Sequence, residues 1–350
     1  MVWPQRIEAA FLKQAKSCRD LGSPFTADLM HLLATRDLPE GIVRDRIQDW
    51  PGDPSAAGDA LPLRLAGALH RLVLTGEAEK LASLYPPRQN DLDADALYPV
   101  LCETLKAHGA FIHDYLDLPP QTNEVRRSSM VMAGLQEIAS RTGLGLSLLE
   151  VGSSSGLNLC PELYEVSLGG SVFGTPGSSV KLQPDWQGNT PANCELHIES
   201  RRGCDQNPLS PSAVEDVLRL KSYTWPDQRD RLDRLENALS ICAQAQPVVD
   251  RADAADWIAA QLEPKAENVC RVVYHSIVLQ YFPEDTKRRF TQSILEAGAR
   301  ASASAPLAWL AIEADGEQPG CRISLTLWPD GSTITLGRAD FHGRWIRWDI

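Results

Sequence analysis

Residues 146–158 read LSLLEVGSSSGLN, and this stretch decides the fold prediction. An apolar run ends in the acid Glu150, a turn of glycine and serine follows, and a segment compatible with a helix begins after Gly156. A buried strand that runs into a tight small-residue turn and then a helix directs backbone N–H groups at one spot, as nucleotide-binding folds do. The stretch therefore predicts a nucleotide-like ligand at the end of a buried strand.

The turn itself can be interpreted as three different motifs. The dinucleotide fingerprint needs glycine at its first, third and sixth positions, but serine and leucine stand at the last two. The nucleophile elbow G-x-S-x-G fits residues 152–156 literally. The turn also resembles the first motif of class I S-adenosylmethionine methyltransferases, with Glu150, Gly152 and Gly156 in their places and Ser154 instead of the middle glycine. The segments that follow have to decide between the three.

Polar residues follow the next apolar runs of the chain as well. Residues 194–200 alternate as a strand does and lead into Asp205, and a short run at 246–249 leads into Asp253. Both acids also suit turn or helix-cap positions, so each has a purely structural interpretation. Because ligands of open α/β sheets lie outside the carboxyl ends of the strands, this succession of strand ends favours a ligand-binding α/β sheet.

The last third of the chain completes the predicted sheet. Residues 269–276 form an apolar, β-branched run that ends in His275 and Ser276, and residues 306–313 form a fifth strand. Residues 321–348 contain a hairpin pattern around a Pro-Asp-Gly turn. The predicted fold class is α/β: a Rossmann-like, methyltransferase-like sheet of parallel strands with a C-terminal antiparallel hairpin.

The regions before and within the sheet differ from it in composition. Residues 5–117 show the apolar periodicity of helices, so we expect a helical N-terminal domain at 1–120 and an α/β domain at 121–350. A β-rich, Gly- and Pro-rich insertion is expected at about 159–194.

A polar cluster stands between these two domains, directly after two prolines. Gln121, Asn123 and Arg127 are predicted to face the ligand as a lid. The alternative is a helix-capping region, in which Thr122 or Asn123 caps and Glu124 occupies the first turn.

Charge and composition limit the partners. The 350 residues carry 34 Lys and Arg against 46 Asp and Glu, a net charge of −12, which disfavours bulk binding of nucleic acid. No run of 18 apolar residues exists, and the first residues lack a secretory signal pattern. The eight cysteines include no C-x-x-C pair, so no metal site is predicted. We expect a cytoplasmic protein with a small-molecule substrate and no membrane association.

Motifs spread along nearly the whole chain together resemble the bacterial domain-of-unknown-function 2332 family. They are QTNEV from Gln121, LEVGSSSGLNL from Leu149, RGCDQNP from Arg202, WPDQ from Trp225, YHSIVLQY from Tyr274 and DFHGRW from Asp340. The resemblance implies a methyltransferase-like Rossmann core behind a helical N-terminal domain.

The resemblance to methyltransferases implies methyl transfer from S-adenosylmethionine to a small-molecule acceptor. Asp205 would accept the ribose hydroxyls, and Asp253 would meet the adenine. The residues expected at the cofactor are Glu150, Gly152, Ser153, Ser154, Gly156, Asn158, Asp205, Asp253, Ala254 and Ser276.

His275 is expected to deprotonate the acceptor, with Tyr281 as a second candidate, although a histidine at a strand end also has a structural interpretation. Two alternatives remain at this stage. One is a non-catalytic protein of the same fold that binds a nucleotide or adenosylmethionine. The other is a serine hydrolase that uses Ser154 with Asp253 and either His275 or His342.

Overall fold

The computed structural model describes residues 3–89, 91–263 and 267–350. The chain divides into two compact units. The first unit contains Met1–Thr122 and Ala213–Glu236, and the second contains Asn123–Ser212 and Asn237–Ile350.

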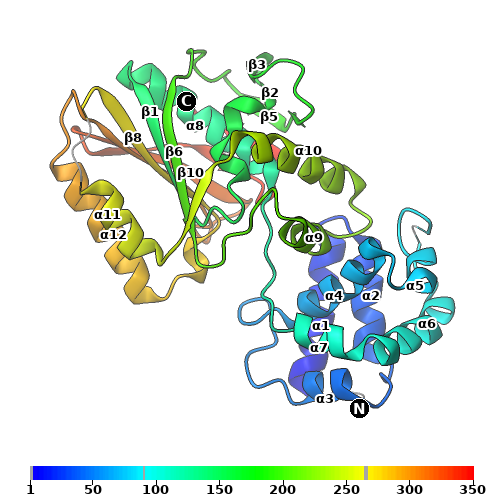
Figure 1. The fold of residues 1–350 in the computed structure, drawn as a ribbon. Coiled ribbons are helices and arrows are strands. Elements are labelled where there is room, and N and C mark those ends of the chain that lie inside the picture. Colours follow the sequence, from blue (N-terminus) through cyan, green and yellow to red (C-terminus); the bar gives the residue numbers. More distant parts are fainter. Residues whose placement is uncertain (1–2, 90, 264–266) are drawn as a thin grey trace. The chain divides into compact units, whose positions relative to one another are not determined.

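The first unit is built from helices (Figure 1). They are α1 (Gln5–Asp20), α2 (Pro24–Thr35), α3 (Ile42–Gln48), α4 (Leu61–Thr75), α5 (Glu79–Ser83), α6 (Ala94–Ala107), α7 (Gly109–Tyr115) and α9 (Val214–Ser222), and α10 (Arg229–Ala245) begins in this unit and ends in the second. Their apolar faces bury a common core that includes Phe11, Phe25 and Leu69. The helical periodicity of residues 5–117 thus corresponds to helices in the structure.

Residues 213–236 group with the helical unit although they follow much of the sheet in sequence. Tyr223, directly after α9, is buried in the helical core, and its hydroxyl donates to Leu118 O at 2.8 Å. Gly67 of α4 leaves room for this ring, since a Cβ there would lie 2.6 Å from it. The Asp227 carboxylate accepts the Phe25 N–H at 2.9 Å near the start of α2. This segment was not expected in the helical domain.

The second unit contains a nine-stranded sheet in the order β5-β12-β11-β10-β9-β8-β1-β6-β7. The strands are β1 (Gly145–Val151), β5 (Asp185–Gly188), β6 (Ile198–Asp205), β7 (Val248–Arg251), β8 (Val269–Ser276), β9 (Leu307–Glu313), β10 (Cys321–Trp328), β11 (Ser332–Ala339) and β12 (Trp345–Trp348). Strands β7, β6, β1, β8 and β9 are parallel, and β10, β11 and β12 continue as an antiparallel meander. The fold is α/β with a mostly parallel central sheet, consistent with a Rossmann-like fold.

Helices cover both faces of this sheet. Successive side chains of β9 point to opposite faces of the sheet. Trp309 packs on the face that is covered by α11 (Ala254–Leu262) and α12 (Glu284–Ala299), and Leu310 packs on the face that is covered by α8 (Ser128–Thr142). Gly134 of α8 packs so closely that a Cβ there would lie 2.5 Å from the Leu310 side chain. Figure 1 shows α11 and α12 together along one face of the sheet.

The insertion forms a second, smaller sheet. Strands β2 (Glu165–Leu168), β3 (Ser171–Gly174) and β4 (Lys181–Leu182) make a three-stranded sheet in the order β3-β2-β4. The next strand, β5, leaves this sheet and pairs in parallel with β12 at one edge of the large sheet.

The predicted strand at 194–200 was placed too early. β6 spans Ile198–Asp205, because its parallel pairing with β1 extends to Cys204 opposite Val151. Charged residues made this strand hard to predict from the sequence. One of them, Arg202, pairs with Asp250 of β7, with 2.6 Å between Nε and Oδ2.

Two short 3-10 helices, η2 (Leu157–Leu159) and η3 (Pro161–Leu163), follow the turn after β1, where the sequence predicted a helix. That prediction was wrong. A proline within the first turns lacks the N–H that an α-helix interior needs, so the helical run ends there.

The part of the chain that the structure describes lacks two features that would indicate a membrane or a metal. Among residues 3–89, 91–263 and 267–350, no helix has both the length and the apolar character needed to cross a bilayer. The same residues contain no cluster of three or more His, Cys, Asp or Glu side chains suited to a metal ion.

The antiparallel meander depends on a buried ion pair, and we predict that breaking it destabilises the second unit. Arg338 of β11 is 8% exposed and donates to both carboxylate oxygens of Asp315 at 2.8 and 3.0 Å. Arg338→Met should lower the free energy of unfolding by roughly 3 kcal/mol, because it leaves a buried carboxylate without its partner. Urea unfolding at neutral pH would measure the loss.

The matched control is Arg322→Met. Arg322 is half exposed and lies 3.8 Å from the same Asp315 carboxylate, so its removal should cost less than about 1 kcal/mol. Equal losses in the two variants would contradict the assigned importance of the buried pair.

Candidate functional site

The order of the parallel strands creates a reversal between β1 and β8. From β1 the chain moves to β6 and then β7 on one side, and it returns to β8 and β9 on the other side. Ligands of open α/β sheets bind outside the carboxyl ends of the strands at such a reversal. The segments that leave β1, β6, β7 and β8 at this edge begin at residues 152, 206, 252 and 277.

The turn after β1 is fastened to the end of β6. Gly152, Ser154 and Gly156 have positive φ angles of 73°, 55° and 75°, a backbone region that suits glycine and few other residues. The N–H groups of Gly152 and Ser153 donate to Cys204 O at 2.9 and 3.0 Å, and the Gly156 N–H donates to Ser153 O at 2.8 Å. These bonds hold the turn against the neighbouring strand.

Two side chains accept the remaining N–H groups of the turn. Asp205 Oδ2 accepts the Ser154 N–H at 2.9 Å. Asn123 Oδ1 accepts the Ser155 N–H at 3.3 Å, the Leu157 N–H at 3.1 Å and the Ser155 hydroxyl at 3.1 Å. Every N–H group from residue 152 to residue 157 therefore has an acceptor within the protein.

The glycines at this edge allow protein segments to approach one another closely. A Cβ on Gly152 would lie 2.5 Å from Cγ2 of Val278, which follows β8. A Cβ on Gly203 of β6 would lie 2.0 Å from the Ser153 hydroxyl oxygen. Because these two positions carry no side chain, the ends of β1, β6 and β8 can pack closely against one another.

Asn158 fixes the exit of the turn. It is buried, its Oδ1 accepts the Ser128 hydroxyl at 2.6 Å, and its carbonyl accepts the Tyr274 hydroxyl at 3.0 Å. The residue therefore links α8 and β8 to the segment that leaves β1.

Glu150 is a carboxyl group enclosed at the end of β1. It is 2% exposed, and its Oε2 has no hydrogen-bond partner. Burial raises the pKa of Glu150 to about 8, and the nearby Cys160 and Asp205 act in the same direction. The group is therefore protonated at neutral pH, since the charged form is disfavoured away from water.

The Ser154 hydroxyl has no partner either. The residue is 3% exposed, and Oγ makes no hydrogen bond within the described protein. A nucleophilic serine needs a base aligned on its hydroxyl. The bonds that activate a serine hydrolase are thus not formed at Ser154 in this structure.

His275 is enclosed in a hydrogen-bonded group of three side chains. It is fully buried, with Glu313 Oε1 2.7 Å from Nδ1 and the Trp309 indole N–H donating to Nε2 at 2.9 Å. Because Nε2 accepts, the ring proton lies on Nδ1 and is donated to the carboxylate. Both ring nitrogens are therefore engaged, an arrangement that favours a structural role over the proton transfer predicted for His275.

Glu313 connects this group to the segment after β8. Its Oε1 also accepts the N–H groups of Val278 at 3.0 Å and Leu279 at 3.4 Å. Tyr281, the second catalytic candidate, lies three residues after Val278 in η4 (Leu279–Tyr281) and is 66% exposed.

Arg127 joins three parts of the second unit. It closes η1 (Val125–Arg127), and its guanidinium donates to Ser276 O and to Phe341 O, both at 3.0 Å. Ser276 was predicted at the cofactor, and its carbonyl is engaged by this bond. Gly343 lies close to the same segment, since a Cβ there would be 2.8 Å from Arg126 O. The DFHGRW motif therefore supports the segment that carries Asn123.

The two acids predicted to bind the nucleoside also support local backbone. Asp205 Oδ1 accepts the Asn207 N–H at 2.8 Å. Asp253 caps α11, because its Oδ1 accepts the N–H groups of Ala255 at 3.0 Å and Asp256 at 3.2 Å. Ala254 is the buried first residue of that helix. The structure thus places both acids at carboxyl ends of strands and gives each a capping bond.

Gln121 belongs to the first unit, whereas Asn123 and Arg127 belong to the second. Its predicted position beside the turn stays a prediction.

Sequence reasoning missed Glu313 and Trp309. Glu313 is the last residue of β9, so the pattern of polar strand ends that identified Glu150 would also have identified it. Trp309 carried no comparable signal, because its role depends on the packing of β9 beside β8.

Comparison with known proteins agrees with the sequence motifs. A family model described as "Uncharacterized protein conserved in bacteria (DUF2332)" matches residues 8–348. No curated protein and no solved structure matches the chain.

The raised pKa of Glu150 predicts a pH-dependent stability. The pKa of the Glu150 carboxyl group is about 8 in the folded state, whereas its ordinary pKa is 4.5. The contribution of this proton to the free energy of unfolding is complete below pH 4.5. It is lost as the pH rises toward 8, because the unfolded chain releases the proton at a lower pH than the folded chain does. Each pKa unit is worth about 1.4 kcal/mol, so the loss should be on the order of 4 kcal/mol.

Glu150→Gln should remove this part of the pH dependence. Urea unfolding at pH 5, 6.5 and 8 would compare the variant with the wild type and with Glu296→Gln, an exposed carboxyl on α12. A difference between Glu150→Gln and the wild type that does not change with pH would contradict the buried, protonated acid.

We also predict that Ser154→Gly stabilises the protein by about 1 kcal/mol. The substitution relieves the positive φ and removes a buried hydroxyl without a partner. Ser155→Gly is the matched control and should destabilise, because the Ser155 hydroxyl donates to Asn123. Thermal and urea unfolding would measure both, and a loss of stability in Ser154→Gly would contradict the inferred strain.

Proposed function

Because the chain belongs to the DUF2332 family, whose description states no activity, we propose its function from the geometry of the second unit. We propose that it binds S-adenosylmethionine at the carboxyl ends of β1, β6 and β7 and transfers the methyl group to a small-molecule acceptor. The observation that carries the proposal is the position of Asp205 at the end of β6, bonded to the turn after β1.

Asp205 is suited to a ribose. Each carboxylate oxygen accepts one N–H group of the protein, from Ser154 and from Asn207. A carboxylate only accepts hydrogen bonds and can accept several at once, which suits the paired hydroxyl donors of a ribose. The two backbone bonds hold the carboxylate in place before a ligand arrives, which lowers the entropic cost of binding.

Asp253 is suited to the adenine end. Oδ1 makes both capping bonds of α11, which leaves Oδ2 to accept an exocyclic amino group. The neighbouring Ala254 is small and apolar and is compatible with a flat base. In the proposal, the nucleoside extends from the end of β6 toward the end of β7, which is its neighbour in the sheet.

The turn after β1 fits the cofactor only in part. Its N–H groups from residue 152 to residue 157 already have acceptors, so they cannot hold the carboxylate of the methionine portion. The buried Oε2 of Glu150 and the Ser154 hydroxyl have no partner. Both groups are enclosed by the protein in this structure, so the proposal assigns neither of them a bond to the ligand.

The protein contributes alignment more than acid–base chemistry. The bound cofactor supplies an electrophilic methyl group, and the main task of the site is to orient it toward the acceptor. No proton transfer is assigned to His275, because Glu313 and Trp309 occupy its nitrogens. Its role in the proposal is to position the segment after β8.

A non-catalytic protein that binds the same cofactor is the alternative that one observation favours. Of the two catalytic candidates, His275 is fully buried with both ring nitrogens engaged, and Tyr281 is 66% exposed. Binding without turnover would indicate this alternative.

Calorimetric titration with S-adenosylmethionine and S-adenosylhomocysteine tests the proposal. Asp205→Ala should weaken binding at least tenfold, because a hydrogen bond to a charged group is worth roughly 1.5–3 kcal/mol and about 1.4 kcal/mol is tenfold. Asp205→Asn, which keeps one acceptor oxygen, should weaken it less. Asp256→Asn, on the first turn of α11, is the matched control.

Unchanged affinity in folded Asp205→Ala would remove this residue from the site. No binding of either molecule to the wild type would contradict the proposed function itself. Stoichiometric labelling of Ser154 by a fluorophosphonate would favour the hydrolase instead.

A further inference from the structure

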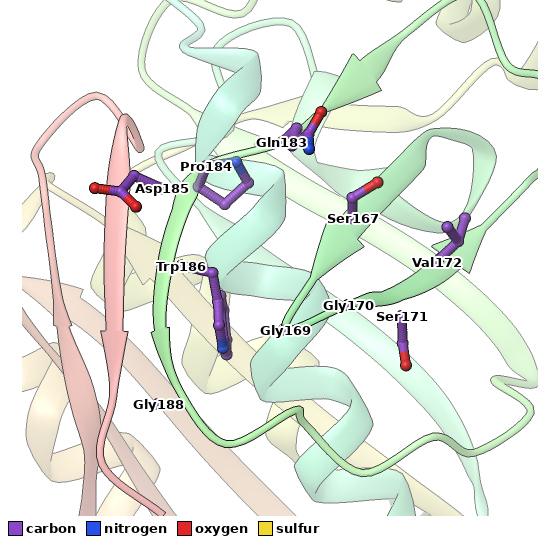
Figure 2. Close-up of a pocket in the computed structure, with 10 residues that line it drawn as sticks. All are labelled: Ser167, Gly169, Gly170, Ser171, Val172, Gln183, Pro184, Asp185, Trp186 and Gly188. Atoms are coloured by element: carbon purple, nitrogen blue, oxygen red, sulfur yellow. The ribbon is translucent and has the colours of Figure 1, made fainter.

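The insertion contains a hollow that the proposed function does not use. It has a volume of about 850 Å³ and lies between β5 and the turn that joins β2 to β3. Figure 2 shows its lining residues, which come from both sheets of the second unit. β5 stands at the opposite end of the nine-stranded sheet from β6 and β7. The hollow is therefore separate from the strand ends that carry Asp205 and Asp253.

The indole of Trp186 is held in a fixed position in this hollow. Its ring lies 5.7 Å from the ring of Trp348, and its N–H donates to Asn189 O at 3.1 Å. The turn after β2 fits against it, since a Cβ on Gly169 would lie 3.1 Å from the indole nitrogen. The side chain is only partly buried. An aromatic surface is thus presented to the hollow with little conformational freedom left to lose on binding.

Polar groups without a fixed partner surround the indole. The side chains of Ser167, Ser171 and Gln183 line the hollow and make no hydrogen bond to other described residues. They offer two hydroxyls and one amide, which can both donate and accept. In Figure 2, Gln183 lies on the segment that leads into β5, which carries Trp186, and Ser167 lies on β2.

The charge of the lining narrows the class of ligand. Among its ten residues, Asp185 is the only charged one, and none is basic. Phosphates, nucleotides and other anions are disfavoured, because their recognition relies on Arg, Lys or clustered N–H groups. A quaternary ammonium ion would prefer a cage of several aromatic rings, and only one ring lines this hollow.

We propose that this hollow binds a neutral saccharide. The flat face of a sugar ring carries C–H groups that pack on an indole, and its hydroxyls pair with short polar side chains. A volume of about 850 Å³ lies within the range of small-molecule sites and accommodates one or two sugar rings. The insertion is then a carbohydrate-binding element at the edge of the nine-stranded sheet.

Saturation-transfer NMR with glucose, N-acetylglucosamine, maltose and cellobiose tests the proposal. We expect at least one of these sugars to bind with a Kd of about 10 mM or tighter. Trp186→Ala should weaken binding at least tenfold, Trp186→Phe should retain part of it, and Gln183→Ala should weaken it several-fold. Gln292→Ala, an exposed glutamine on α12, is the matched control and should leave binding unchanged.

Gln183 keeps the test decisive if Trp186→Ala fails to fold, because its exposed side chain supports no other residue. Binding that is unaffected by Gln183→Ala and Trp186→Phe would overturn the proposal. Absence of binding for all four sugars would also overturn it. Tryptophan-dependent binding of tetramethylammonium in place of the sugars would show a cation site and overturn the assigned class.

Discussion

The second unit depends on one constraint, which is the need to satisfy the N–H groups of the turn after β1. Within the turn only the Gly156 N–H finds an acceptor, Ser153 O, and the N–H groups of Gly152 and Ser153 reach Cys204 O of β6. Asp205 and Asn123 supply the missing acceptors. Asn123 in turn requires its own segment to be held, and Arg127 does so by reaching the end of β8 and the DFHGRW motif. Residues far apart in sequence are thus joined through a few backbone donors.

The same requirement explains why acids at equivalent strand ends differ in their surroundings. Glu150 is enclosed, so burial raises its pKa and it retains its proton. Asp205 is less enclosed, and its carboxylate oxygens accept the N–H groups of Ser154 and Asn207. Glu313 accepts from two backbone N–H groups and faces the ring of His275. Acids at the ends of neighbouring strands therefore differ in protonation and in hydrogen-bond partners, according to their burial.

The elements with strong local patterns were predictable from the sequence. The apolar, β-branched run of β8 and the hairpin of β10 and β11 match the predicted strands, because alternation and turn chemistry are local properties. The bounds of β6 were misplaced, since its arginines are compatible with a strand only once Glu162 pairs with Arg201 and Asp250 pairs with Arg202. The bonds of Asn123 could not be predicted, because its partners lie 32 and 34 residues away and meet it only in the folded chain. Engagement of both nitrogens of His275 likewise depends on β9, which is added to the sheet beside β8.

The position of β5 has a consequence for synthesis of the chain. This strand emerges from the ribosome before β6, yet its partner in the large sheet is β12, whose residues Trp345–Trp348 lie far downstream in the chain. About 160 residues must therefore be translated before β5 can pair, and at 5–20 residues per second this takes on the order of ten seconds or more. During that interval the three-stranded sheet is the only described sheet to which the insertion belongs. Because β2 and β3 pair as antiparallel neighbours across a short turn, this sheet needs only local contacts to form while β5 is still without β12.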